Sequence, residues 1–206
     1  MSDVTRSMEA TTADATARVV RQRRTFASGW WGMALLIATE FTLFASLIAS
    51  YFYLRFQNDQ WPPAGIEDPS LALPLALTGI LVLTTVPMFG AVAAGRAGHR
   101  WRAWMLVALA MVVQGAYLGL QIWLFADDMN SFSPSATAYG SIYFTLLGVH
   151  HVHVAVGLAL DLWLLGALAF GLTNYRFLAL RVIALYWYFV AFIGVAVVIT
   201  QIYPSL

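Results

Sequence analysis

The sequence predicts an all-α membrane protein with five transmembrane helices, and composition is the first observation behind this. Of its 206 residues, 61% are hydrophobic and only 10% are charged, whereas a soluble domain carries roughly 25% charged residues. A domain this small still exposes much of its surface, so a large core cannot account for the missing charge. We therefore expect lipid to solvate the chain, which excludes a soluble enzyme and a nucleic-acid binder.

The second observation is the spacing of the charges, which leaves five long runs with few or no charged residues. Each run can cross a hydrocarbon core about 30 Å thick as a helix. A helix satisfies its own backbone hydrogen bonds, as lipid requires, so strands are not expected. The expected spans are about 29–56, 71–95, 101–126, 137–171 and 178–203, which together make a transmembrane domain over 29–206.

The first 28 residues are polar and form a tail. They lack an apolar run, so no cleavable secretory signal is expected. Their arginines predict a mobile or surface-lying cytoplasmic segment that touches anionic lipid.

Arginine placement predicts the orientation. Ten of the eleven basic residues, all arginines, fall at one side of the five spans, and the other side carries acids. This bias places the N-terminus in the cytoplasm and the C-terminus outside. The expected inner aromatic anchors are Trp30, Trp31, Trp101 and Trp104, and the expected outer belt is Tyr139, Tyr143 and Tyr203.

Two spans carry packing features. In the second, Pro87 is expected to bend the helix, and Thr84 or Thr85 to help satisfy the carbonyl that it frees. The third holds a small-residue seam that favours close helix packing over a site. The seam consists of Gln114, Gly115, Tyr117 and Gly119.

Glu40 lies about eleven residues past the inner aromatic anchor, or roughly 16 Å along a helix, near mid-membrane. Without a nearby counter-charge a buried carboxyl favours its neutral form. Two interpretations stay open: a proton-exchanging carboxyl, or a neutral acid that fixes packing by a hydrogen bond.

Three histidines lie on the fourth span, where His150 and His153 should share a face and His151 should point elsewhere. A metal site is not expected, because the chain has no cysteine and the histidines do not lie on facing helices. Hydrogen bonding between helices, with Glu40 as one partner, is the favoured use. Asp161 follows two turns later, and we expect it to have a structural role, either by reaching the inner interface or by bonding a neighbouring helix.

This inventory contains no nucleophile–base pair and no cofactor set. It favours a supporting subunit of a larger membrane complex, with an independent channel or transporter as the alternative.

The segments, in their order, resemble subunit III of the haem–copper oxidases in its short five-helix bacterial form. The resemblance runs from Trp30 to Tyr203. Its motifs are Trp30-Trp31-Gly32, Thr39-Glu40, Tyr51-Phe52, Trp61-Pro62-Pro63, Gln114-Gly115, Tyr139-Gly140-Ser141, Gly148-x-His150-x-x-His153-Val154-x-x-Gly157 and Tyr186-Trp187-x-Phe189-Val190. Departures include Tyr117 and Leu118 where relatives have an acid, and Gly194 where they have a tryptophan.

The resemblance implies a subunit of the bacterial cytoplasmic membrane with no cofactor or catalytic residue of its own. Haem and copper would lie in subunit I, the main partner, with subunit II and phospholipids as further partners. The resemblance also implies a lipid-filled cleft and a subunit that stabilises the catalytic subunit and supports its proton uptake and O₂ access. Glu40, His150, His153 and Asp161 are the buried polar candidates; Trp30, Trp31, Gln114, Gly115, Gly119, Gly157 and Trp187 are the packing or lipid-cleft candidates. A quinol oxidase and a nitric oxide reductase complex are the alternatives within this class.

Overall fold

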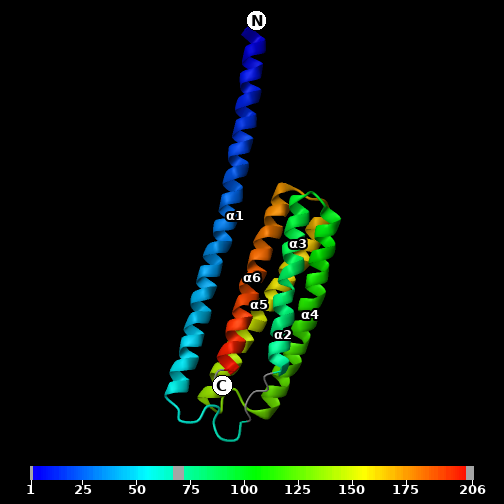
Figure 1. The fold of residues 1–206 in the computed structure, drawn as a ribbon. Helices are drawn as coiled ribbons and strands as arrows, with labels where there is room; N and C mark the ends of the chain where they lie inside the picture. The colour runs from blue at the N-terminus through cyan, green and yellow to red at the C-terminus, as the bar shows by residue number, and fades with distance from the viewer. Residues whose placement is uncertain (1, 67–71, 203–206) are drawn as a thin grey trace.

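The computed structural model of the chain describes residues 2–66 and 72–202, with side chains from Ser28 onward. The described residues form helices and no strands (Figure 1). The helices are α1 (Ser2–Phe56), α2 (Ala72–Leu83), α3 (Thr85–Arg96), α4 (Arg100–Ser131), α5 (Ala138–Ala169) and α6 (Asn174–Ile202). Five stretches are long and apolar enough to cross a membrane, because α2 and α3 together make one span. The predicted all-α class and the five spans are confirmed.

Helix ends differ from the expected boundaries in three places, one of which is the start of α6 at Asn174, four residues before the expected 178. The tail expected over 1–28 continues α1 as helix back to Ser2, and this part projects past the ends of the other helices (Figure 1). α4 runs to Ser131, five residues beyond the expected end of its span. Composition alone set the predicted ends, and helical hydrogen bonding continues into polar sequence beyond the apolar run.

The second span is divided at Thr84, which separates α2 from α3. Pro87 then falls in the first turn of α3, where its missing N–H leaves no helical bond unmade. The Thr84 hydroxyl donates to the Leu81 carbonyl at 2.6 Å and the Thr85 hydroxyl to the Val82 carbonyl at 2.7 Å. The threonines therefore bond the carbonyls before the break and not the Leu83 carbonyl that Pro87 frees.

α6 lies at the centre of the bundle and packs against α1, α2, α3 and α5. α4 completes the bundle on the side of α3 and α5. α1 is peripheral, since among the described residues it packs on α5 and α6 alone (Figure 1).

The aromatic residues expected in the outer belt lie elsewhere. Tyr139 and Tyr143 are only 2% and 8% exposed, so the belt prediction is wrong for both. They stack on each other with ring centroids 5.6 Å apart, and Trp61 meets Tyr139 edge-on. These rings close the bundle end near the α1–α2 loop instead of facing lipid. Tyr203, the third predicted belt residue, lies outside the described residues, as do Glu67 and Asp68.

Candidate functional site

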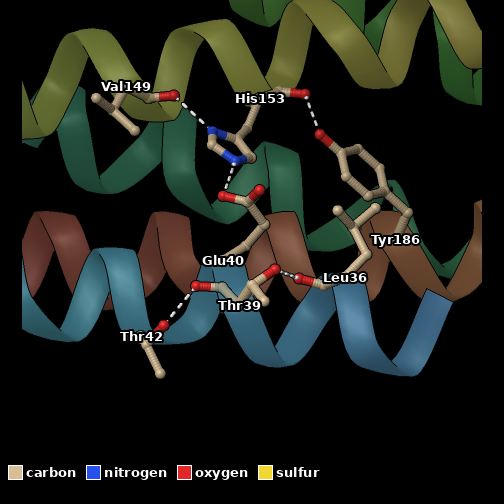
Figure 2. Close-up of polar contacts among 7 residues, drawn as sticks. All are labelled: Leu36, Thr39, Glu40, Thr42, Val149, His153 and Tyr186. Atoms are coloured by element: carbon tan, nitrogen blue, oxygen red, sulfur yellow. Dashed lines mark hydrogen bonds and ion pairs between the residues drawn. The ribbon is translucent and has the colours of Figure 1, made fainter. Parts of the chain in front are cut away.

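Glu40 on α1 meets His153 on α5 inside the membrane domain. Glu40 Oε2 lies 3.0 Å from His153 Nε2, and the two side chains are 26% and 14% exposed (Figure 2). The threonines on either side of Glu40 do not compete for it, because Thr39 and Thr42 donate to carbonyls of their own helix. His153 is thus the polar partner that the structure gives to Glu40.

Backbone geometry decides how protons are distributed in this pair. His153 Nδ1 lies 2.8 Å from the Val149 carbonyl, which can only accept, so Nδ1 carries a hydrogen (Figure 2). Nε2 then either accepts from a protonated Glu40 or donates to its carboxylate. Each arrangement places one proton between Nε2 and Oε2, and the pair has zero net charge in both. Such a pair can exist in lipid without a further counter-ion.

Two more residues hold the pair in place. The Tyr186 hydroxyl on α6 donates to the His153 carbonyl at 2.9 Å (Figure 2). Phe44, only 1% exposed, presents its ring at 63° to the His153 ring with centroids 5.0 Å apart. The site therefore joins α1, α5 and α6.

A second polar network lies deeper in the bundle around Asp161, which is fully buried. The Trp187 indole N–H on α6 donates to Asp161 Oδ2 at 2.8 Å. The same ring covers Gly157, where an added Cβ would come within 2.6 Å of Trp187 Cζ2. Gly157 and Trp187, both expected to be packing residues, thus contact each other directly.

Gln114 on α4 connects Asp161 to the break in the second span. With its amide nitrogen toward Asp161, Gln114 donates to Asp161 Oδ2 at 3.1 Å and to the Ala110 carbonyl at 3.2 Å. Its amide oxygen then lies 3.1 Å from the Thr84 hydroxyl, whose single hydrogen can point to this oxygen or to the Leu81 carbonyl. This orientation gives both Asp161 and the Ala110 carbonyl a donor from Gln114 and is the one we adopt. Thr84, Gln114, Asp161 and Trp187 then form one chain of hydrogen bonds across the bundle.

His150 faces a different helix from His153, so the predicted shared face is only approximate. A three-residue step on a helix turns about 300°, which leaves the two side chains about 60° apart. His150 Nε2 lies 3.3 Å from the Tyr117 hydroxyl on α4, and Gln121 donates to that hydroxyl at 3.3 Å. A Cβ at Gly194 would come within 3.2 Å of the His150 ring. Two of the departures from the family pattern, Tyr117 and Gly194, therefore meet at His150.

The small-residue seam of α4 does not pack as expected. An added Cβ at Gly115 or Gly119 would meet nothing within 4 Å, so the prediction of close helix contact there is wrong within this chain. Gln114 and Tyr117 from the same stretch are buried instead. Trp30 and Trp31 are 44% and 61% exposed and meet edge to face.

The polar groups of the described segments do not form a set that would hold haem or copper. Within residues 28–66 and 72–202, no group of three or more His, Cys, Asp or Glu side chains is gathered as a metal site would need. The nitrogens of His153 are engaged by Val149 and Glu40, and Nε2 of His150 by Tyr117. A haem would need such nitrogens free and on facing helices.

Sequence reasoning missed Tyr186 and Thr84 as parts of these networks. Both are tied through hydroxyl groups, one to the His153 carbonyl and one to Gln114. Hydroxyls are common in transmembrane helices, and a sequence gives no sign of which one reaches another helix.

Comparison with known proteins gives one family. A family model described as "Cytochrome c oxidase subunit III" matches residues 5–205. The chain is 29% identical over 174 residues to a protein of Pseudomonas aeruginosa named cytochrome bo(3) ubiquinol oxidase subunit 3, with 82% of this chain and 80% of the relative covered.

Two further relatives show how widely the similarity extends. A probable cytochrome c oxidase subunit 3 of Nocardia farcinica is 30% identical over 177 residues, covering 82% of this chain and 84% of the relative. Cytochrome c oxidase subunit 3 of Coturnix japonica is 29% identical over 78% of this chain, which spans only 63% of that longer relative.

Proposed function

Since this chain belongs to the cytochrome c oxidase subunit III family, we propose that it packs beside the catalytic subunit of a haem–copper oxidase and stabilises that subunit during turnover. The observation that carries this proposal is the family match over residues 5–205. The expected partners are subunit I, as the main contact, and subunit II.

Side-chain chemistry supports a supporting role over a redox role. His150 bonds to tyrosine and His153 to glutamate and backbone, and no group of three or more metal-ligating side chains is found in the described residues. Haem and copper are therefore proposed to lie in the partner subunit, where they supply the electron transfer to O₂. The contribution of this chain is packing, lipid binding and the placement of protonatable groups.

The Glu40–His153 pair supports a contribution to proton uptake. Its single shared proton can lie on either atom at zero net charge, so a proton can move within the pair without leaving an isolated charge in lipid. The pair is part-exposed at the surface formed by α1, α5 and α6. We assign it as the proton-linked site of the subunit.

Location and orientation complete the proposal. The chain is a multi-pass membrane protein, and the Pseudomonas relative fits a bacterial cytoplasmic membrane. Arg96, Arg100 and Arg102 lie at the end of the bundle shared with the N-terminal part of α1, and Asp127 and Asp128 lie near the opposite end of α4 (Figure 1). This distribution supports an N-terminus in the cytoplasm. A lipid-filled cleft, and the access of O₂ through it, are also part of this proposal.

Two electron donors are compatible with the proposed complex, ubiquinol and cytochrome c. One relative is named as a ubiquinol oxidase subunit and others as cytochrome c oxidase subunits. An independent transporter, which the buried acids alone could have suggested, is not favoured by the family match.

Purification of the tagged chain in mild detergent tests the proposal. We expect a haem absorbance band to co-purify with the chain in constant ratio. Deleting the gene should leave the haem spectrum of the remaining complex intact while O₂ consumption declines faster during sustained turnover. A haem-free homo-oligomer, or sustained turnover unchanged by the deletion, would contradict the role.

A further inference from the structure

We propose that the groove between α3 and α4, at the arginine-rich end of the bundle, binds one anionic phospholipid of the phosphatidylglycerol type. The groove lies apart from the Glu40–His153 pair and adds a ligand site to the proposed function. Its volume is about 590 Å³. The walls are formed by Gly90, Ala93, Ala94 and Ala97 from α3 and by Arg102, Met105, Leu106 and Leu109 from α4, with His99 at the turn.

The turn between α3 and α4 positions the cationic side chains. Gly98 adopts φ +78°, and the His99 N–H donates to the Ala94 carbonyl at 2.9 Å, which reverses the chain in a few residues. His99 and Arg102 are three positions apart and both line the groove. Both side chains are exposed. The polar side chains of the groove therefore lie at one end of it, and its other lining residues are apolar.

Backbone amides add to this positive end. α4 is a 32-residue helix that begins at Arg100, and the His99 side chain does not cap its first turn. The first N–H groups of a helix and its dipole favour a phosphate.

No acidic side chain compensates this charge in the part of the chain that the structure describes. The ion pair found there joins Glu40 to His153, and neither Arg96, Arg100 nor Arg102 takes part in one. Arg100 lies over the Trp101 ring at 5.1 Å, so its charge is partly engaged. Arg102 has no such partner and is the residue positioned to meet a phosphodiester by charge-assisted hydrogen bonds.

The rest of the groove suits an acyl chain. Gly90, Ala93, Ala94 and Ala97 carry no long side chain, so the α3 wall of the groove is low, and Leu106 lies close against Gly90. Met105 and Leu109 form the opposing apolar wall and are exposed. A phosphate at Arg102 and a chain lying toward Gly90 would follow the membrane normal, as a bilayer lipid does. A helix of a second protein would instead have to bring its own anion to Arg102.

Native mass spectrometry of the intact oxidase complex, purified in mild detergent and supplied with phosphatidylglycerol or phosphatidylcholine, tests the site. We expect wild type to retain one more phosphatidylglycerol than Arg102→Gln, with apparent affinity about tenfold lower in the variant because a charge-assisted contact is lost. Ala93→Phe fills the trough without changing charge and should lose the same lipid. Arg181→Gln is the matched control, since it neutralises an exposed arginine of α6 that does not line the groove.

Equal retention in wild type and Arg102→Gln overturns the proposal, as does equal loss in Arg181→Gln, which would indicate general surface charge. A photoreactive p-benzoylphenylalanine in place of Met105, an exposed residue of the opposing wall, identifies the occupant directly. An adduct with the mass of phosphatidylglycerol supports the site, and a cross-link to another protein chain overturns it. Haem content of the same samples reports separately on the proposed function.

Discussion

Trp187 donates its indole N–H to Asp161 from the neighbouring helix at 2.8 Å, and both side chains are at most 1% exposed. This bond joins α5 to α6 at a depth where water cannot substitute for either partner. Together with the bond from the Tyr186 hydroxyl to the His153 carbonyl, it fixes the relative height of α5 and α6.

Replacing Asp161 should reveal what the carboxyl contributes. Asp161→Leu leaves the indole N–H and the Gln114 amide without their acceptor, and each unpaired group costs on the order of 1–3 kcal/mol. Asp161→Asn keeps an acceptor oxygen, so we expect a clearly smaller loss. Denaturant titration of the detergent-solubilised complex measures both variants. Equal destabilisation by Asn and Leu would contradict the hydrogen-bonding role.

Gly157 should not tolerate a methyl group. Alanine there places Cβ within 2.6 Å of Trp187 Cζ2, and overpacking of this kind costs about 1–3 kcal/mol. Gly119→Ala is the matched control, because a Cβ at Gly119 meets nothing within 4 Å. We expect the control to be neutral or slightly stabilising, as alanine is the better helix former. Thermal inactivation of the two variants checks the contrast, and the prediction fails if Gly157→Ala is as stable as the control.

Glu40 and His153 should be coupled to each other. In a double-mutant cycle with Glu40→Gln and His153→Leu, we expect a coupling free energy of about 1 kcal/mol, in the range of hydrogen bonds between membrane helices. The carboxyl band of Glu40 in infrared difference spectra should change in His153→Leu, because its partner is gone. A band that is identical in wild type and His153→Leu would exclude the contact as a shared-proton site.

The chain has no cysteine, so single cysteines report its orientation without background from this chain. Ser133 in the α4–α5 connection and Asn174 at the start of α6 are both exposed. On spheroplasts, a membrane-impermeant maleimide should label Ser133→Cys. It should leave Asn174→Cys unlabelled until the spheroplasts are broken. The reverse pattern would place the N-terminus outside.

Sequence alone predicts the number and type of helices because the bilayer imposes a length and a composition on each of them. The division at Thr84 is harder to predict. Pro87 signals a bend, but which residue leaves the helix depends on the hydrogen bonds from Thr84 and Gln114, and these need the packed bundle. The Glu40–His153 contact was within reach of the sequence, since both residues fall at similar depth on separate spans.

The burial of Tyr139 and Tyr143 could not be predicted from the sequence. Tyr139 and Tyr143 have the position of interfacial residues, yet they stack on each other, Trp61 meets Tyr139 edge-on, and both tyrosines are nearly inaccessible. Depth in a bilayer follows from residue count along a helix, whereas the direction a side chain faces follows from which helices become neighbours. Gly115 and Gly119 illustrate the same limit, because a small-residue pattern marks a possible contact without naming the helix that makes it.

The peripheral place of α1 has a consequence for biosynthesis. It leaves the ribosome before the other described helices, yet within the described residues its partners are α5 and α6, which are made after α2, α3 and α4. Until residues 138–202 have been translated, Glu40 faces lipid without His153. The membrane span of α1 must therefore remain in the bilayer without these partners, or contact another polypeptide, until α5 and α6 have been made.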